Sequence, residues 1–194
     1  IANRAMEAEL TGFEFAAGIP GTLGGACVMN AGAYGGEMKD VLETVTVLTR
    51  DGDVKTLTKD ELELGYRTSV IAKKDYIALS AVIRLENGKK EEIKAVMDDL
   101  KEKRITKQPL EYPSAGSTFK RPEGYFAGKL IQDAGLRGFQ VGGAQVSEKH
   151  CGFVVNKDQA TAADVMNLMN QVSDKVYEMS GVRLEPEVKR LGVF

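Results

Sequence analysis

The chain has 194 residues, 43% of them hydrophobic and 28% charged, which is ordinary for a globular protein with room for one or two cores. A formal net charge of −2 and a pI near 5.6 leave no basic field for nucleic acid, so that any anionic ligand must be held by a few local groups. No apolar run approaches the ~20 residues that span a bilayer, so that we expect no membrane partner. The two cysteines (Cys27 and Cys151) are far apart in sequence and there is one histidine (His150), which argues against a metal site. We therefore expect a cytoplasmic protein with free thiols and no metal.

The first feature along the chain is a dense glycine segment over residues 18–36, which reads GIPGTLGGACVMNAGAYGG. Two stretches of alternating apolar and polar residues follow, at 41–50 and 54–58, on either side of an Asp51-Gly52 pair. Because such a pair favours the turns that join antiparallel strands, the pattern predicts a β-hairpin.

Beyond the hairpin, Thr58 and Glu61 have the spacing of a capping box, which predicts a short helix that ends near Gly65. Residues 77–85 (IALSAVIRL) predict a further strand. Residues 89–107 then predict a long helix, because apolar residues recur at helical spacing and charged residues occupy the other positions. That apolar stripe consists of Ile93, Val96, Met97 and Leu100.

Two prolines, Pro109 and Pro113, follow this helix closely. Because proline disfavours helical backbone in the residue before it, the helix must stop and a new region must begin there. We therefore place a domain boundary at about residue 105, which gives predicted domains of residues 1–104 and 105–194.

The second domain is predicted to contain a helix over 125–136 and a strand over 153–156. A long helix follows over 162–180, with Thr161 as its cap, and a final strand covers 182–189. The predicted fold class is therefore α+β. The apolar face expected for the long helix consists of Val165, Leu168, Met169, Val172, Val176 and Met179.

The turn at 18–25 (GIPGTLGG) has neither the Lys-Ser/Thr of a P-loop nor the GxGxxG of a dinucleotide-binding fold. Its glycines allow positive φ and a close approach of the backbone, so that consecutive N–H groups could form a nest for a pyrophosphate. A short helix that starts near Thr22 would point its first N–H groups the same way. A tight turn packed against a sheet would explain the same glycines without any ligand.

The run from Gly18 to Gly35 is similar to the second flavin-binding segment of the UDP-N-acetylenolpyruvoylglucosamine reductase family and, more distantly, to flavoproteins with a vanillyl-alcohol-oxidase type of FAD domain. The resemblance implies that the turn lies along the FAD pyrophosphate. It also implies that residues 1–104 are the C-terminal part of such an FAD-binding domain and that residues 105–194 form a smaller α+β domain for a UDP-sugar substrate. The residues that it assigns to the cofactor are Gly18, Ile19, Pro20, Gly21, Thr22, Gly24, Gly25, Asn30, Ala31 and Gly32.

Two further motifs match the same family in chain order. The sequence YRTS at 66–69 fits its Tyr-Arg-x-Ser pattern, and the resemblance makes Arg67 the catalytic arginine that holds the enolpyruvyl carboxylate. Without the resemblance, Arg67 would read as a surface arginine. The sequence AGSTF at 115–119 fits the family's Ala-Gly-Ser-x-Phe, which makes Ser117 the proton donor.

A third motif is LEPEV at 184–188, which fits the C-terminal Leu-Glu-x-Glu-Val of the family. The resemblance makes Glu187 the third catalytic residue. In alternating strand geometry Glu185 and Glu187 point to the same face, so that the choice between them rests on the family pattern.

The segments around residues 121–156 also match the substrate domain of the family. Arg121 and Lys129 are predicted contacts of the UDP diphosphate, because basic side chains must offset its charge. A solvated helix face is the alternative for Lys129. Tyr66 and Gln132 complete the predicted substrate site, and His150 is predicted to be a packed hydrogen-bonding residue.

In this family, FAD reduced by NADPH passes hydride to the enolpyruvyl ether of UDP-N-acetylglucosamine and gives UDP-N-acetylmuramate for peptidoglycan synthesis. Family members carry an upstream subdomain with its own glycine-rich segment, which we do not find before Gly18. We therefore expect the chain to be the C-terminal two-thirds of such an oxidoreductase, with weak or no FAD binding without the missing N-terminal subdomain. The alternatives are another FAD-domain oxidoreductase that acts on an alcohol and a non-catalytic nucleotide-sugar-binding fragment.

Overall fold

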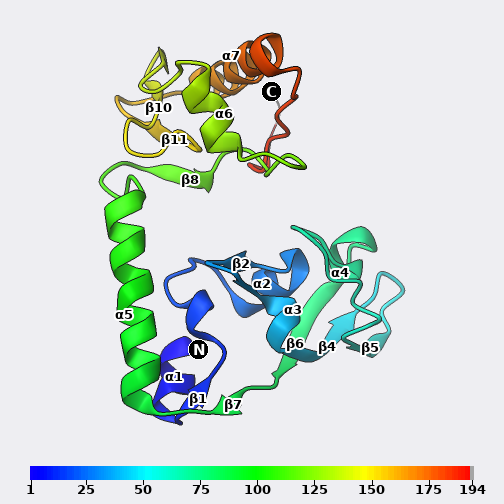
Figure 1. Cartoon of the computed structure of the whole chain (residues 1–194). Coiled ribbons are helices and arrows are strands. Elements are labelled where there is room, and N and C mark those ends of the chain that lie inside the picture. Colours follow the sequence, from blue (N-terminus) through cyan, green and yellow to red (C-terminus); the bar gives the residue numbers. More distant parts are fainter. Residues whose placement is uncertain (193–194) are drawn as a thin grey trace. The chain divides into compact units, whose positions relative to one another are not determined.

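The computed structural model describes residues 1–192 of the chain. These residues fall into two compact units, 1–103 and 104–192, and each unit has a hydrophobic core of its own. The division falls beside the boundary that we placed at residue 105. Helices and sheets occur in both units (Figure 1), so that the predicted α+β class is confirmed.

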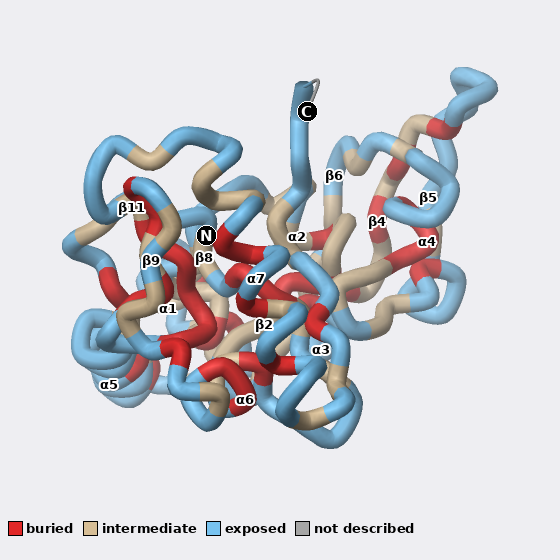
Figure 2. The backbone as a smooth tube through the Cα atoms, turned by 90° about the horizontal axis from the view of Figure 1, so that it is seen from above, coloured by how far each residue is buried: buried red, intermediate tan, exposed pale blue. Residues whose placement is uncertain are grey.

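The first unit is built on a three-stranded antiparallel sheet with the order β5-β4-β6. Its strands are β4 (Leu42–Leu48), β5 (Val54–Thr58) and β6 (Ile77–Ile83). The predicted hairpin of β4 and β5 is confirmed, with Gly52 at φ +88° in the turn. Val45 in the central strand is fully buried, whereas the edge strand β5 is pale blue along most of its length in Figure 2.

Shorter elements complete the first unit. The helix α2 (Leu23–Met29) packs on β6, and its Cys27 is buried in the core. Burial raises the pKa of the Cys27 thiol to about 11, so that the thiol stays protonated. Cys151, in the second unit, is likewise buried and free. The remaining elements are α1 (Ala2–Glu7), β1 (Leu10–Thr11) paired with β7 (Glu86–Asn87), the 3₁₀ turn η1 (Glu14–Ala16), the hairpin of β2 (Gly32–Ala33) and β3 (Gly36–Glu37), α3 (Met38–Val41) and α4 (Val70–Lys73).

The helix α5 (Lys90–Lys107) crosses the division and confirms the long helix predicted over 89–107. Of its predicted apolar stripe, Ile93 and Leu100 are buried, but Val96 is half exposed. The buried positions are one heptad apart, so that the helix buries a narrower stripe than the pattern predicts.

The second unit has a four-stranded antiparallel sheet with the order β8-β11-β10-β9. Its strands are β8 (Ser114–Ser117), β9 (Gln140–Val141), β10 (Ala144–Val146) and β11 (Phe153–Asn156), of which only β11 was predicted. The others escape prediction because such short strands show too little alternation.

Two helices, α6 (Ala127–Asp133) and α7 (Ala162–Ser180), complete this unit. The bounds and the cap of α7 are as predicted: Thr161 Oγ1 accepts the Asp164 N–H at 3.1 Å, and the Asp164 carboxylate accepts the Thr161 N–H at 2.9 Å. α6 is shorter than the predicted range 125–136. The buried face of α7 contains Leu168, Met169, Val172 and Val176, whereas Met179 is half exposed.

The short helix predicted at 58–65 is wrong. Thr58 and Glu61 do form hydrogen bonds, since the Glu61 carboxylate accepts the Thr58 N–H and hydroxyl at 2.8 Å each. Glu63 has φ +46°, however, which lies outside the right-handed helical region, and the segment forms turns. Within residues 1–192, no helix is long and apolar enough to cross a membrane.

Candidate functional site

The glycine turn of the first unit leads directly into α2. Thr22 is the N-cap of this helix, and its Oγ1 accepts the Gly25 N–H at 3.1 Å. Gly18 and Gly21 have φ of +82° and +127°, which other residues rarely adopt, so that the path of the turn depends on glycine. The helix therefore begins where we expected, and its first N–H groups have no partner within the helix itself.

A pocket of about 530 Å³ lies beside this turn. Its walls are apolar, and within the described residues no charged side chain lines it. Such a pocket suits a flat ring, while the peptide N–H groups of the glycine turn can donate to a phosphate. The residues present therefore fit FAD. The predicted cofactor residues that line the pocket are Ile19, Pro20, Gly21, Thr22, Gly25 and Ala31.

Of the predicted cofactor glycines Gly24 and Gly32, packing within the unit explains one. A Cβ on Gly24 would lie 3.7 Å from the Ala78 carbonyl oxygen of β6, which is an ordinary contact and does not require glycine. A Cβ on Gly32 would lie only 2.7 Å from both the Glu37 Cβ and the carbonyl oxygen of Gly36, so that the β2–β3 hairpin cannot close with a larger residue there. A contact of these two glycines with the cofactor remains a prediction.

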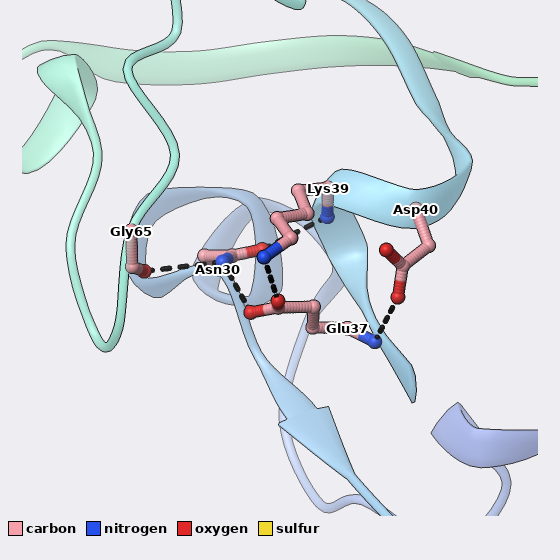
Figure 3. A network of polar contacts seen from close by, with 5 residues as sticks. All are labelled: Asn30, Glu37, Lys39, Asp40 and Gly65. Atoms are coloured by element: carbon pink, nitrogen blue, oxygen red, sulfur yellow. Dashed lines mark hydrogen bonds and ion pairs between the residues drawn. The ribbon is translucent and has the colours of Figure 1, made fainter. Parts of the chain in front are cut away.

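Asn30 ends α2 in the left-handed conformation, with φ +47°, and is buried. Its Nδ2 donates to Glu37 Oε2 at 2.7 Å and to the Gly65 carbonyl at 3.1 Å, and its Oδ1 accepts the Lys39 N–H at 2.8 Å (Figure 3). Both amide hydrogens are thus committed within the protein. The side chain cannot also donate to a cofactor, so that the predicted cofactor contact of Asn30 would have to use its backbone or the second lone pair of Oδ1.

The predicted catalytic residue Arg67 lies at the tip of a tight turn. Gly65 and Thr68 exchange two backbone hydrogen bonds, of 3.1 and 3.3 Å, which leave Tyr66 and Arg67 between them. Arg67 has φ +55°, and its guanidinium carbon lies 5.2 Å from the centroid of the Tyr66 ring. Because Tyr66 is half exposed, this pair stands at the surface of the first unit.

Ser69 anchors the other end of this turn. Its buried hydroxyl donates to the Val28 carbonyl of α2 at 2.6 Å and accepts the Ala72 N–H at 3.3 Å as the cap of α4. The Tyr-Arg-x-Ser motif contains this serine, but we gave it no role. Its partner is 41 residues away in sequence, and no local pattern shows such a contact.

In the second unit, Ser117 and Glu187 lie on segments that pair through their backbones. Ser117 is the last residue of β8, and the carbonyl of the next residue, Thr118, accepts the Glu187 N–H at 2.9 Å. Thr118 is buried, and its Oγ1 accepts the Val154 N–H of β11 at 2.8 Å, which fixes the segment on the sheet. The structure therefore pairs Glu187 with Thr118, the residue that follows Ser117, so that the two predicted catalytic residues lie on adjacent segments.

Pro186 interrupts the C-terminal segment at this point. It lies opposite Phe119 in an isolated bridge, and the hydrogen bonds on either side are made by Glu185 and Glu187. The ladder needs no N–H from the central residue of such a pair, so that proline fits there. Of the strand predicted over 182–189, only this bridge forms within the described residues, and the rest of that prediction is wrong.

The two glutamates beside Pro186 have different surroundings. Glu185 is exposed and forms an ion pair with Lys120 across the ladder, whereas Glu187 is half-buried. A solvent-exposed carboxylate that is already paired with lysine is poorly suited to proton transfer. The exposure of Glu185 and its pairing with Lys120 thus argue against Glu185, and the role of Glu187 remains a prediction.

The predicted diphosphate contacts lie on α6 and just before it. The Arg121 guanidinium stacks on the exposed Phe126 ring, 4.0 Å from its centroid. Lys129 forms an ion pair with Asp133 on the exposed side of α6. That arrangement is what a solvated helix face predicts for Lys129, and its contact with UDP remains a prediction.

Arg137, to which we gave no role, links the end of α6 to the loop around His150. Its guanidinium donates to Gln132 Oε1 at 2.8 Å. His150 Nδ1 accepts the Gly152 N–H at 3.0 Å and its ring packs edge-on against Phe153, as expected for a packed hydrogen-bonding residue. Burial, and secondarily the charge of Arg137, lower the pKa of His150.

Comparison with known families gives a consistent division of the chain. Residues 3–58 match the family described as FAD binding domain, and residues 108–191 match the family described as UDP-N-acetylenolpyruvoylglucosamine reductase, C-terminal domain. The fold, the pocket of the first unit and the paired segments of the second unit thus define a protein with an FAD-binding domain followed by the C-terminal domain of a reductase.

Individual relatives are similar over nearly the whole chain. UDP-N-acetylenolpyruvoylglucosamine reductase from Agathobacter rectalis is 66% identical over 194 residues, and the protein of the same name from Clostridioides difficile is 60% identical over 95% of this chain. The crystal structure of the reductase from Thermus caldophilus matches 96% of this chain and 67% of its own with a TM-score of 0.82 and 39% identity. The chain belongs to the UDP-N-acetylenolpyruvoylglucosamine reductase family, as the motifs predicted. It spans 62% and 60% of the lengths of the two relatives named first.

Proposed function

We propose that this chain supplies the catalytic groups for the reduction of UDP-N-acetylglucosamine enolpyruvate to UDP-N-acetylmuramate, in the cytoplasmic synthesis of peptidoglycan precursors. The observation that carries the proposal is the backbone pairing that places Glu187 opposite Thr118, the residue after Ser117, in the second unit. The apolar pocket beside the glycine turn supports FAD as the cofactor. FAD, when bound and reduced by NADPH, supplies the hydride, and the protein supplies position and electrostatics.

Side chains of this protein stabilise the negative charge that forms in the reaction and deliver the proton that completes it. Addition of hydride to the methylene carbon of the enolpyruvyl ether moves an electron pair onto the neighbouring carbon and its carboxylate. The Arg67 guanidinium binds that carboxylate and stabilises the charge. The Ser117 hydroxyl gives its proton to the neighbouring carbon, which completes the new C–H bond, and Glu187 on the paired segment assists this transfer.

The first test is the visible absorbance of the purified 194-residue chain after incubation with excess FAD and desalting. Because the chain spans 62% of the Agathobacter rectalis relative, we expect it to retain little FAD alone and a clear flavin band when it is joined to the remaining part of that relative. The joined protein should consume NADPH and form UDP-N-acetylmuramate, detected by mass spectrometry. A flavin-loaded joined protein that leaves the enolpyruvyl ether intact would overturn the proposal.

A matched pair of variants tests the choice of glutamate. Glu187→Gln should slow the reduction of the enolpyruvyl substrate by about tenfold or more, because it removes the carboxyl group from the half-buried position. Glu185→Gln breaks only the exposed pair with Lys120 and should change the rate by about twofold or less. Equal losses in the two variants would sink the assignment of Glu187.

A nucleotide-sugar-binding role without catalysis is the second candidate, and the basic side chains Arg121 and Lys129 on the exposed side of the second unit favour it. In that case the second unit should bind UDP-N-acetylglucosamine equally well with and without FAD. Isothermal titration under the two conditions distinguishes the candidates when it is combined with the assay of the joined protein.

A further inference from the structure

The turn that carries Arg67 is attached to the first unit by two buried side chains. At one end the Gly65 carbonyl accepts a hydrogen bond from Asn30, and at the other end Ser69 donates to the Val28 carbonyl. Asn30 and Val28 both lie at the C-terminal end of α2, whose N-terminal end follows the glycine turn. One helix of two turns therefore connects the pocket-lining turn with the arginine turn.

Asn30 is the side chain on which this connection depends most. It is 1% exposed, and its amide joins three segments: the Glu37 side chain in β3, the backbone of Lys39 in α3 and Gly65 in the arginine turn. Figure 3 shows the amide between the Gly65 carbonyl and the Glu37 carboxylate, with Lys39 on the same side as Glu37. The position requires a short side chain that donates twice and accepts once, which among the standard residues describes asparagine.

The acceptor of this network is itself held in place. Glu37 forms an ion pair with Lys39, and its N–H donates to Asp40 Oδ2 at 2.8 Å. Lys39 and Asp40 therefore hold the carboxylate and the backbone of Glu37, respectively, in addition to the bond from Asn30. An aspartate at position 30 would keep the shape of the side chain but would lose both donors and bring a second carboxylate against Glu37.

We infer that Asn30 is a positioning residue, which sets where the Arg67 guanidinium stands relative to the glycine-lined pocket without itself touching substrate or cofactor. The inference rests on the proposed function, because Arg67 acts on a substrate only if the enolpyruvyl reduction takes place. The family resemblance groups Asn30 with the cofactor residues, whereas its hydrogen bonds give it a different task.

The test uses the variant Asn30→Gly with Val45→Ala as its control. Glycine removes the amide but readily adopts φ +47°, so that the end of α2 is not strained. Val45→Ala opens a cavity in the core of the same unit and controls for a general loss of stability. In the 194-residue chain, amide hydrogen exchange of residues 65–70 should become about tenfold faster or more in Asn30→Gly, beyond any change in the rest of the unit. Val45→Ala should not single out these residues.

The second readout separates positioning from cofactor binding. In the FAD-loaded holoenzyme that contains this chain, stopped-flow absorbance follows flavin reduction by NADPH and flavin reoxidation by the enolpyruvyl substrate. Asn30→Gly should slow the second step by about tenfold or more and change the first by about twofold or less, because only the second step uses Arg67.

Two results would overturn the inference, and a third would restrict it to the attachment of the turn, without a role in catalysis. Unchanged exchange at residues 65–70 would overturn it, because Asn30 would then not hold the turn. Equal losses of flavin retention and of both steps would overturn it in favour of a cofactor ligand. If the unmodified holoenzyme leaves the enolpyruvyl substrate intact, the proposed function fails and the role in catalysis fails with it, while the exchange result still decides whether Asn30 anchors the turn.

Discussion

The two units hold their predicted catalytic residues in different ways. In the first unit, Arg67 stands on a two-residue turn whose attachment depends on the buried side chains of Asn30 and Ser69. In the second unit, Ser117 and Glu187 stand on segments that are paired through peptide groups, which every residue except proline can supply in full. A single side-chain substitution can therefore release the first arrangement, whereas the second rests on its backbone pairing, on the Thr118 hydroxyl bond and on the core beneath it.

The core beneath the ladder has a clear composition. Phe119 lies within the paired segments and Leu184 directly precedes them, and both are buried in one cluster with Leu168 and Val172 of α7. Ser173 adds a hydrogen bond from its hydroxyl to the Leu184 carbonyl, at 3.3 Å. Polar side chains thus fix the site of the first unit, and apolar packing supports the site of the second. The following predictions test this contrast, beginning with the largest expected effect.

Removal of the Ser117 hydroxyl should abolish chemistry without disturbing the ladder. Ser117→Ala keeps the peptide groups that pair the segments, so that only the proton donor is lost. We expect reduction of the enolpyruvyl substrate to slow by about 10²–10⁴-fold, with flavin reduction by NADPH unchanged, in stopped-flow measurements on the holoenzyme. If both steps slow equally, Ser117 is not the proton donor.

Loosening the core should damage the second unit alone. Leu168→Ala removes a fully buried side chain of α7 and should lower the free energy of unfolding of that unit by about 2–5 kcal/mol. Urea unfolding followed by hydrogen exchange in β10 and β11 measures the effect, with the amides of β4 as an internal control. An equal loss in β4 would show that the units do not unfold separately.

Ser69→Ala should release the second anchor of the arginine turn. The substitution leaves the Val28 carbonyl without its hydroxyl donor and removes the cap of α4, so that we expect a loss of about 1–2 kcal/mol, measured by urea unfolding of the first unit. A Ser69→Thr variant keeps a hydroxyl and serves as its control. If exchange at residues 65–70 does not change in Ser69→Ala, the turn is held by Asn30 alone.

A smaller effect should come from the cap of α7. Thr161→Ala removes the acceptor of the Asp164 N–H and should cost the second unit about 1 kcal/mol. Thr161→Ser keeps the acceptor and should cost much less. A loss in Thr161→Ser as large as that in Thr161→Ala would mean that the methyl group, and not the cap, matters.

The smallest effect should appear as a dependence on pH. Burial and the charge of Arg137 lower the pKa of His150 in the folded second unit. As the pH falls, the unfolded chain therefore binds a proton at His150 near the ordinary pKa of about 6.5, whereas the folded unit binds it only at a lower pH. The contribution to stability is therefore complete above about pH 6.5 and falls as the pH drops toward the lowered pKa. Urea midpoints between pH 7.5 and 5 should show this slope, and His150→Gln should reduce it.

The parts of the fold that could be predicted are those whose signals are local. The bounds of α7 follow from one cap at Thr161 and five turns of apolar spacing, and β11 follows from a short apolar run. A local signal misled the prediction at 58–65. Thr58 and Glu61 form the expected hydrogen bond, but Glu63 has a positive φ and no helix forms there. Short strands such as β9 and β10 are formed by pairing, and pairing partners are not visible in a local pattern.

The candidate site shows the same limit. The family motifs identified Arg67, Ser117 and Glu187 as candidates. Strand geometry added that Glu185 and Glu187 point to the same face. That the segments of Ser117 and Glu187 pair with each other depends on a contact between distant parts of the chain, and the task of Asn30 depends on Gly65, 35 residues away. Contacts of this kind require the tertiary structure.

Pro186 bears on how the second unit reaches its paired state. If the C-terminal segment slipped by one residue against Thr118, the proline would stand where Glu187 now donates its N–H, and no hydrogen bond could form there. The same slip would turn Glu187 to the opposite side of the ladder. A C-terminal segment that pairs one residue out of register therefore lacks a hydrogen bond and dissociates more readily. Pro186 thus favours the observed register over the shifted one.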